Sequence, residues 1–185
     1  FPLSIVSQQP SPRQRRLPIS VESLGHFVPT LAVNPDNPLR NLDLLQTREL
    51  LAGRIKNWSE LGGADAPIRL LLPTSKTRRS TYASTLIQGD ALGEGIASSD
   101  DPRARLRAVA NDRHAVTFAP LPSVQDLGLP ALRIADQAPG IGAGYQFKKE
   151  FFLITGPTGR TAEARRVREL LLGRASPLPA SLIRF

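Results

Sequence analysis

The residue types that most often carry chemistry are sparse in this sequence, and they form no known metal-binding pattern. Cysteine is absent, which excludes disulfides, thiolate metal ligands and cysteine nucleophiles. His26 and His114 are far apart in the chain, and neither belongs to a group of ligands spaced as in known metal sites. The sequence therefore predicts no metal ligands and no cofactor.

Carboxylates and serines give no enzyme pattern either. Nothing in the sequence brings Glu60 near the Asp100–Asp101 pair for acid–base catalysis, and Asp101 stands before a proline, as a helix cap does. Ser75, Ser80 and Ser84 lack the Gly-x-Ser-x-Gly turn that marks a hydrolase nucleophile. We therefore expect a protein that binds a partner or ligand and is not an enzyme.

The formal net charge of +8 comes mostly from arginine and is spread along the chain. The densest basic clusters are 13–16, 76–79 and 103–107, none of which is a long run of like charge. Only 5% of the residues are aromatic, too few for the base-stacking surfaces of single-strand binders. Nucleic acid is therefore not the expected partner.

The arginines of the last helix, including Arg165 and Arg166, form either a solvated face or a docking surface for an acidic partner.

Apolar periodicity predicts strands that alternate with short helices. Strands are expected at 3–7, 17–21, 27–33, 68–72, 115–118, 131–134 and 151–155, and helices at 43–54, about 78–88, 103–110 and 161–172. Such alternation is typical of an α/β fold. Trp58 is expected to pack in the core after the first helix, and 140–144 is a glycine-rich loop. No apolar stretch approaches the ~20 residues that a transmembrane helix needs.

Two sequence motifs at 32–63 carry a family resemblance. The segment 32–42, AVNPDNPLRNL, resembles the "vNpdNPvknLt" segment of phosphate-type periplasmic solute-binding proteins. The segment 50–63, LLAGRIKNWSELGG, is similar to "ifsGkItnWsevGG" of the same family. The order and spacing of both motifs agree with the family, and weaker similarities at 6–11, 113–118 and 145–153 extend the resemblance along nearly the whole chain.

The resemblance implies a periplasmic-binding-protein-like α/β fold of type II with two lobes. We expect a single such domain at 1–185, with one lobe at 1–33 plus 131–185 and the other at 34–130. The family's opening strand–helix–strand, with its anion loop, has no counterpart, so the first lobe is expected to be reduced.

The chain opens with Phe1-Pro2 and contains no methionine, so we expect a mature or excised piece whose signal peptide lies outside it. The expected location is periplasmic or otherwise extracytoplasmic.

In this family an oxyanion sits in the cleft between the lobes, at a Ser-Gly-Thr-Arg turn that opens a helix. A dehydrated anion needs several N–H and O–H donors, and a helix start supplies them. The residues that the resemblance places at the ligand are Ser75, Thr77, Arg78 and Ser80, with Ser7 and Gln8 from the opposite lobe.

The chain departs from the family pattern at this turn and elsewhere. Lys76 replaces the middle glycine, which alters the site if that glycine is needed for close backbone approach. The acidic residue that accepts a ligand proton in some members aligns with Gln8 or Ser7. The two glycines of the family's "pGaIGY" segment are replaced by His114 and Thr117.

Two functions remain open at this point. The first is non-catalytic binding of phosphate or a similar oxyanion in the cleft, as in substrate-binding proteins of ABC transporters, with a membrane component of such a transporter or another protein as partner. The second is a degenerate binding-protein fold that acts as a sensory, scaffold or protein-interaction domain without a small ligand.

Overall fold

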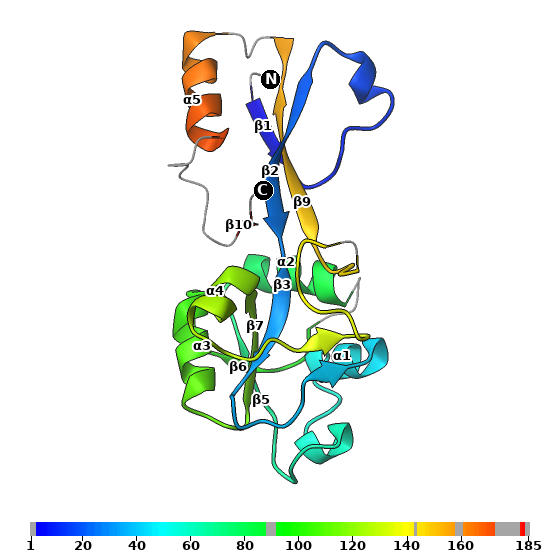
Figure 1. Ribbon diagram of the computed structural model, residues 1–185, viewed down its shortest axis with the longest axis vertical. Helices are drawn as coiled ribbons and strands as arrows, with labels where there is room; N and C mark the ends of the chain where they lie inside the picture. The colour runs from blue at the N-terminus through cyan, green and yellow to red at the C-terminus, as the bar shows by residue number, and fades with distance from the viewer. Residues whose placement is uncertain (1–2, 88–91, 143, 158–160, 173–181, 184–185) are drawn as a thin grey trace. The chain divides into compact units, whose positions relative to one another are not determined.

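The computed structural model describes residues 3–87, 92–142, 144–157, 161–172 and 182–183. The chain forms two compact units (Figure 1): unit 1 is Phe1–Phe27 with Lys149–Phe185, and unit 2 is Val28–Lys148. These limits differ from the boundaries expected after residues 33 and 130. Strand pairing explains the difference, because residues 29–33 pair with residues 116–120 of unit 2. Leu132 N–H donates to Leu31 O at 2.8 Å and Tyr145 Oη donates to Pro29 O at 2.7 Å, so the segment after residue 130 joins the same sheet.

Unit 2 is built around a mixed sheet with the strand order β3-β7-β5-β6. Its strands are β3 (Pro29–Val33), β5 (Arg69–Leu72), β6 (Ile96–Ala97) and β7 (Ala115–Pro120). β5 runs parallel to β6 and β7, whereas β3 is antiparallel to β7. Every residue of β3 and β7 is buried, and both strands are accordingly apolar on both faces except for Thr30 and Thr117.

Helices cover the two faces of this sheet. On one face, α3 (Pro102–Ala110) and α4 (Leu121–Asp126) pack on β7 through a cluster that includes Leu106, Val109 and Val124. On the other, Tyr82 of α2 (Lys76–Leu86) contacts Phe118, with ring centroids 4.3 Å apart. A small parallel pair, β4 (Asn41–Leu42) and β8 (Arg133–Ile134), completes the unit.

Local capping patterns set the helix ends. Asp43 Oδ1 accepts from Gln46 N–H at 2.7 Å and Gln46 Oε1 accepts from Asp43 N–H at 3.0 Å, so a capping box opens α1 (Leu44–Leu51). The structure thus shortens the helix expected at 43–54. The helix expected from Arg78 or Ser80 begins earlier, at Lys76, and its expected end at residue 88 lies outside the described residues. Asp101 caps α3 as expected.

Trp58 is fully buried and confirms its expected place in the core. It opens the short 3-10 helix η2 (Trp58–Leu61), and its Nε1 donates to His114 O at 3.0 Å. This bond joins the turn after α1 to the residue before β7. Trp58, part of the second motif that carried the family resemblance, therefore has a packing role.

Unit 1 is an antiparallel sheet with the strand order β1-β9-β2-β10. Its strands are β1 (Leu3–Val6), β2 (Ser20–Phe27), β9 (Lys149–Thr155) and β10 (Leu182–Ile183), and a 3-10 turn η1 (Gln14–Arg16) lies before β2. β2 begins and ends later than the strand expected at 17–21. Its second half was not predicted because polar Glu22 and Ser23 and a register shift between Ser23 and Gly25 (φ 127°) interrupt the apolar alternation.

The last helix, α5 (Ala162–Leu172), belongs to unit 1 (Figure 1). Its buried residue is Ala164, whereas Val167 and Leu170, expected on its apolar face, are 44% and 59% exposed. An ion pair between Arg168 and Glu22 of β2 ties the helix to the sheet. Among the described residues, no helix combines the length and hydrophobicity required to span a bilayer.

The capping box of α1 predicts the effect of Asp43→Ala. Loss of the carboxylate leaves Gln46 N–H without its acceptor, so the free energy of unfolding should fall by about 1 kcal/mol in urea denaturation followed by circular dichroism. Asp36→Ala removes the same charge from an exposed turn residue and should leave the midpoint nearly unchanged. Equal losses in both variants would contradict a capping role.

Candidate anion-binding site

Four of the six predicted ligand residues lie together at the start of α2, in unit 2. Ser75 is the N-cap: its backbone is extended and its Oγ accepts from Arg78 N–H at 3.4 Å. Thr77, Arg78 and Ser80 follow in the first two turns, and their side chains are exposed. No acceptor for the N–H groups of Lys76 and Thr77 is seen within the described residues, as is usual in a first helical turn.

The other two predicted residues, Ser7 and Gln8, lie in unit 1. Both are exposed and directly follow β1. Each group is therefore described within its own unit, and the joint assignment of all six residues to one ligand stays a prediction.

A carboxylate of the protein itself already occupies part of the helix start. Asp100 Oδ1 accepts from Ser75 N–H at 2.8 Å, and Asp100 also accepts bonds from Thr74. The bond from Ser75 contributes most to holding the pKa of Asp100 below its ordinary value. Thr74 and the positive charge of Arg78 act in the same direction, against the effect of burial. The positive end of the α2 dipole thus faces an internal anion.

Arg105, one turn into α3, is the most deeply buried charge of this region. Its side chain is 1% exposed, although the sequence places it in a basic cluster typical of a surface. It donates to Ser99 O at 2.5 Å, to Phe118 O at 3.1 Å and to Thr117 Oγ1 at 3.2 Å. Burial lowers the pKa of Arg105, and the nearby Tyr82 and Asp100 counteract part of that effect.

Tyr82 connects this charge to α2. Burial raises the pKa of Tyr82 to about 12, against the opposing effects of Arg105 and Arg78. The phenol therefore stays neutral at physiological pH and can donate or accept a hydrogen bond. Asp100, Arg105 and Tyr82 form a polar cluster directly beside the predicted ligand residues, and sequence reasoning missed it. The Asp100 bond to Ser75 spans 25 residues, and Tyr82 lies on a different helix from Arg105, so no local spacing could have indicated the cluster.

Other side chains considered for chemistry have structural surroundings. His26 is buried in β2, with its Nε2 3.8 Å from Glu150 Oε2 on β9. The carbonyl of His114 accepts from Trp58 Nε1 and from Arg69 N–H. Among the residues that the structure describes, no group of three or more acidic or histidine side chains is arranged to hold a metal ion.

Two hollows lie within single units, and none of the six predicted residues lines either one. The hollow of unit 2 measures about 430 Å³ and is mainly apolar, with Leu50, Ile55, Ile68 and Leu70 in its wall. The hollow of unit 1 measures about 530 Å³ and lies between the sheet and α5. The start of α2 is therefore an open helix end within its own unit, flanked by the polar cluster.

Comparison with known sequences identifies a protein family and a curated relative that is named as a phosphate-binding protein. A family model described as a PBP superfamily domain matches residues 25–149. The phosphate-binding protein PstS of Bacillus subtilis (strain 168) is 31% identical over 104 residues, which are 56% of this chain and 34% of that protein. The match thus spans about a third of the length of this curated relative.

Solved structures share the fold. An ABC-type phosphate transport receptor from Vibrio cholerae superposes with a TM-score of 0.70 at 18% identity, over 94% of this chain and 74% of that chain. A possible phosphate binding protein from Planctomyces limnophilus DSM 3776 superposes with a TM-score of 0.75 at 16% identity, over 92% and 70%. The predicted α/β fold of the type II periplasmic-binding kind is confirmed.

Arg105→Met tests whether the buried guanidinium holds the polar cluster together. Methionine fills similar space but leaves the oxygens of Ser99, Phe118 and Thr117 without this donor, so unfolding should become easier by about 2 kcal/mol in urea denaturation. The exposed neighbour variant Arg107→Met should change little. A variant as stable as the wild type would mean that desolvating the guanidinium costs as much as its bonds contribute.

Proposed function

The chain belongs to the PBP superfamily, and from that premise we propose that it is a non-catalytic solute-binding module for phosphate or a similar oxyanion. The observation that carries the proposal is that residues 75–80, the nearest match in the sequence to the family's ligand turn, form a helix start capped by Ser75. The matched residues 25–149 include this turn. The relatives are named as phosphate-binding proteins and a phosphate transport receptor, which supports binding over catalysis.

The donors for an oxyanion come from backbone and side chains together. The N–H groups of Lys76 and Thr77 point out of the first turn of α2, where the helix dipole favours negative charge. The exposed guanidinium of Arg78 lies in the same turn and can form a bidentate contact to two oxygens. The hydroxyls of Thr77 and Ser80 add neutral donors, and Ser7 and Gln8 remain the proposed contribution of unit 1.

The replacement of the family's glycine by Lys76 changes how the anion would be held. Lys76 is the first residue of α2 and its side chain is exposed. A lysine there adds a flexible point charge, where a glycine allows the backbone to approach the ligand closely. We therefore expect a site that relies more on charge than the family's turn does.

A second function is favoured by one specific observation. Because Asp100 already accepts the N–H of Ser75 and lies near Arg78, the helix start has part of its negative charge supplied internally. An incoming anion would meet repulsion from this carboxylate. This supports the alternative that the domain binds no small ligand and serves as a sensory, scaffold or protein-interaction domain.

Location and protein partners follow the family in this proposal. Relatives named as ABC transport receptors support an extracytoplasmic location for this chain and a membrane component of such a transporter, or another protein, as its partner. The arginines of α5 offer a surface for an acidic partner.

Isothermal titration with phosphate and with sulfate tests the proposed ligand. The wild-type chain should bind phosphate in the micromolar range, and Arg78→Ala should weaken binding at least about tenfold because a charge-assisted contact is lost. Arg107→Ala removes an exposed arginine of α3 and serves as the matched control. No heat up to millimolar phosphate would sink the proposal and leave the ligand-free alternative standing.

Asp100→Asn tests whether the carboxylate of Asp100 opposes phosphate binding at the start of α2. Asparagine keeps an oxygen that can accept Ser75 N–H but removes the negative charge, so phosphate affinity should rise roughly three- to tenfold in the same titration. The control is Asp101→Asn, which retains a capping residue on α3 while removing a neighbouring charge. Equal gains in both variants would show a general charge effect instead of a local one.

A further inference from the structure

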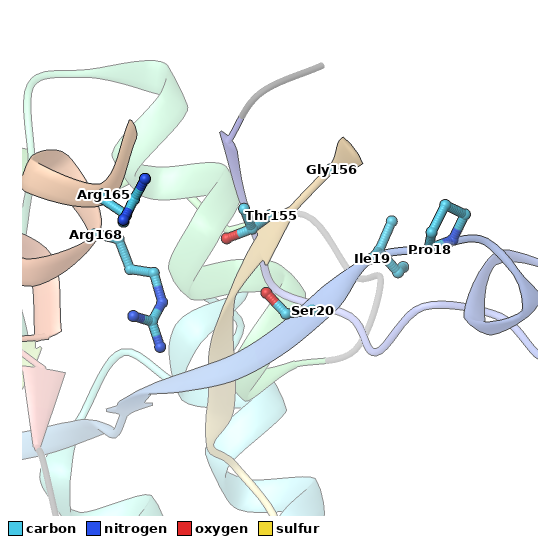
Figure 2. Close-up of a pocket in the computed structure, with 7 residues that line it drawn as sticks. All are labelled: Pro18, Ile19, Ser20, Thr155, Gly156, Arg165 and Arg168. Atoms are coloured by element: carbon cyan, nitrogen blue, oxygen red, sulfur yellow. The ribbon is translucent and has the colours of Figure 1, made fainter. Parts of the chain in front are cut away.

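The hollow of unit 1 lies at the end of the sheet opposite to the strand ends at Phe27 and Lys149, where the chain leaves the unit. Ser20 on β2 and Thr155 on β9 are paired in register, so both side chains lie on one face of the sheet. Figure 2 shows the arginines of α5 on one side of this space and the two hydroxyl side chains of the strands on the other. We call this space the α5 hollow.

An ion pair fixes the helix over the face that carries the hydroxyls. Glu22 lies two residues beyond Ser20 on β2 and therefore on the same face. Its carboxylate accepts from Arg168 Nε at 2.5 Å and from Arg168 Nη2. A bidentate contact thus holds α5 over the end of the sheet.

Polar groups in the α5 hollow lack partners in the described part of the chain. Thr155 Oγ1 is buried and forms no hydrogen bond there, although a buried hydroxyl normally has a partner. The guanidinium of Arg165 is exposed and forms no ion pair with any described carboxylate. Ser20 adds an exposed hydroxyl beside Thr155.

The charged side chains that line the α5 hollow leave one positive charge available for an anionic ligand. Glu22 offsets the charge of Arg168 through the bidentate contact. The bond and charge of Glu22, with a smaller effect of Glu169, raise the pKa of that guanidinium. Arg165 is left as the positive charge available to a guest. Pro18 and Ile19 form an apolar wall, and the volume of about 530 Å³ suits a small organic molecule better than a bare ion.

We propose that the α5 hollow binds a small monocarboxylate with a short apolar body. The guanidinium of Arg165 receives the two carboxylate oxygens in a planar fork, and the hydroxyls of Ser20 and Thr155 donate from the sheet. The hydrocarbon part lies against Pro18 and Ile19. This site shares no residue with the start of α2, so it stands or falls independently of phosphate binding.

The probe for this site is sodium butyrate, titrated into the isotopically labelled full chain at constant ionic strength and followed by amide NMR shifts. Saturable shifts should appear at Ser20, Thr155 and the amides of α5. Arg165→Gln should weaken the binding at least about tenfold, whereas Arg166→Gln, an exposed neighbour outside the hollow, should not. Unsaturable shifts, or equal weakening by both variants, would overturn the proposal.

Two further arms separate ligand binding from folding and from the phosphate site. Thr155→Val keeps the side-chain shape and removes a hydroxyl that has no described partner, so butyrate binding should weaken about threefold while the urea midpoint does not fall. Unchanged butyrate affinity in Thr155→Val would overturn the hydroxyl contact. Inorganic phosphate at the α5 hollow with an affinity equal to that of butyrate would overturn the assignment to carboxylates.

Discussion

A guanidinium that has lost nearly all of its hydration needs oxygen atoms around it, and Arg105 obtains them from three places in unit 2. Its bonds reach Ser99, which precedes α3, and Thr117 and Phe118 in β7. The segment before α3 is thereby held against the central sheet. Because Asp100 follows Ser99 directly, the same bonds fix the carboxylate that meets the start of α2. The surroundings of the candidate ligand turn depend on this one buried charge.

The internal carboxylate gives the two candidate functions a common physical basis. A helix start attracts an anion whether that anion is a ligand or a side chain of the protein. In this chain Asp100 takes the N–H of Ser75, while the N–H groups of Lys76 and Thr77 stay open within the described residues. A binding module would share the helix start between Asp100 and its guest. A docking domain would use Asp100 as the permanent anion.

The arginines that give the chain its positive net charge have different roles in the structure. Arg105 is buried and structural, and Arg168 is bound to Glu22 across unit 1. Arg103 likewise pairs with Asp126, at 2.5 Å. The two arginines to which the proposals assign a ligand are both exposed: Arg78 at the start of α2 and Arg165 in the α5 hollow. Their different neighbours, an aspartate in one case and hydroxyls in the other, call for different anions.

Local patterns in the sequence determined much of the framework. The alternation of strands and helices, the cap at Asp101 and the buried Trp58 were all predicted, because each depends on residues close in the chain or on a run of apolar side chains. The motif at 32–63 identified the family. The sequence also predicted a ligand turn at 75–80, which stays a prediction. It placed the start of that helix too late, at Arg78 or Ser80, whereas Ser75 caps α2 with its hydroxyl.

Only the tertiary structure decided which polar groups are engaged and which are left for a guest. The bond from Ser75 to Asp100, the burial of Arg105 and the pairing of Ser20 with Thr155 join segments that are distant in the chain. The physical reason is that the free energy of a charge or hydroxyl is set by the water it loses and the partners it gains on packing. Residue type and local periodicity indicate neither the hydration that a group loses nor the partners that it gains.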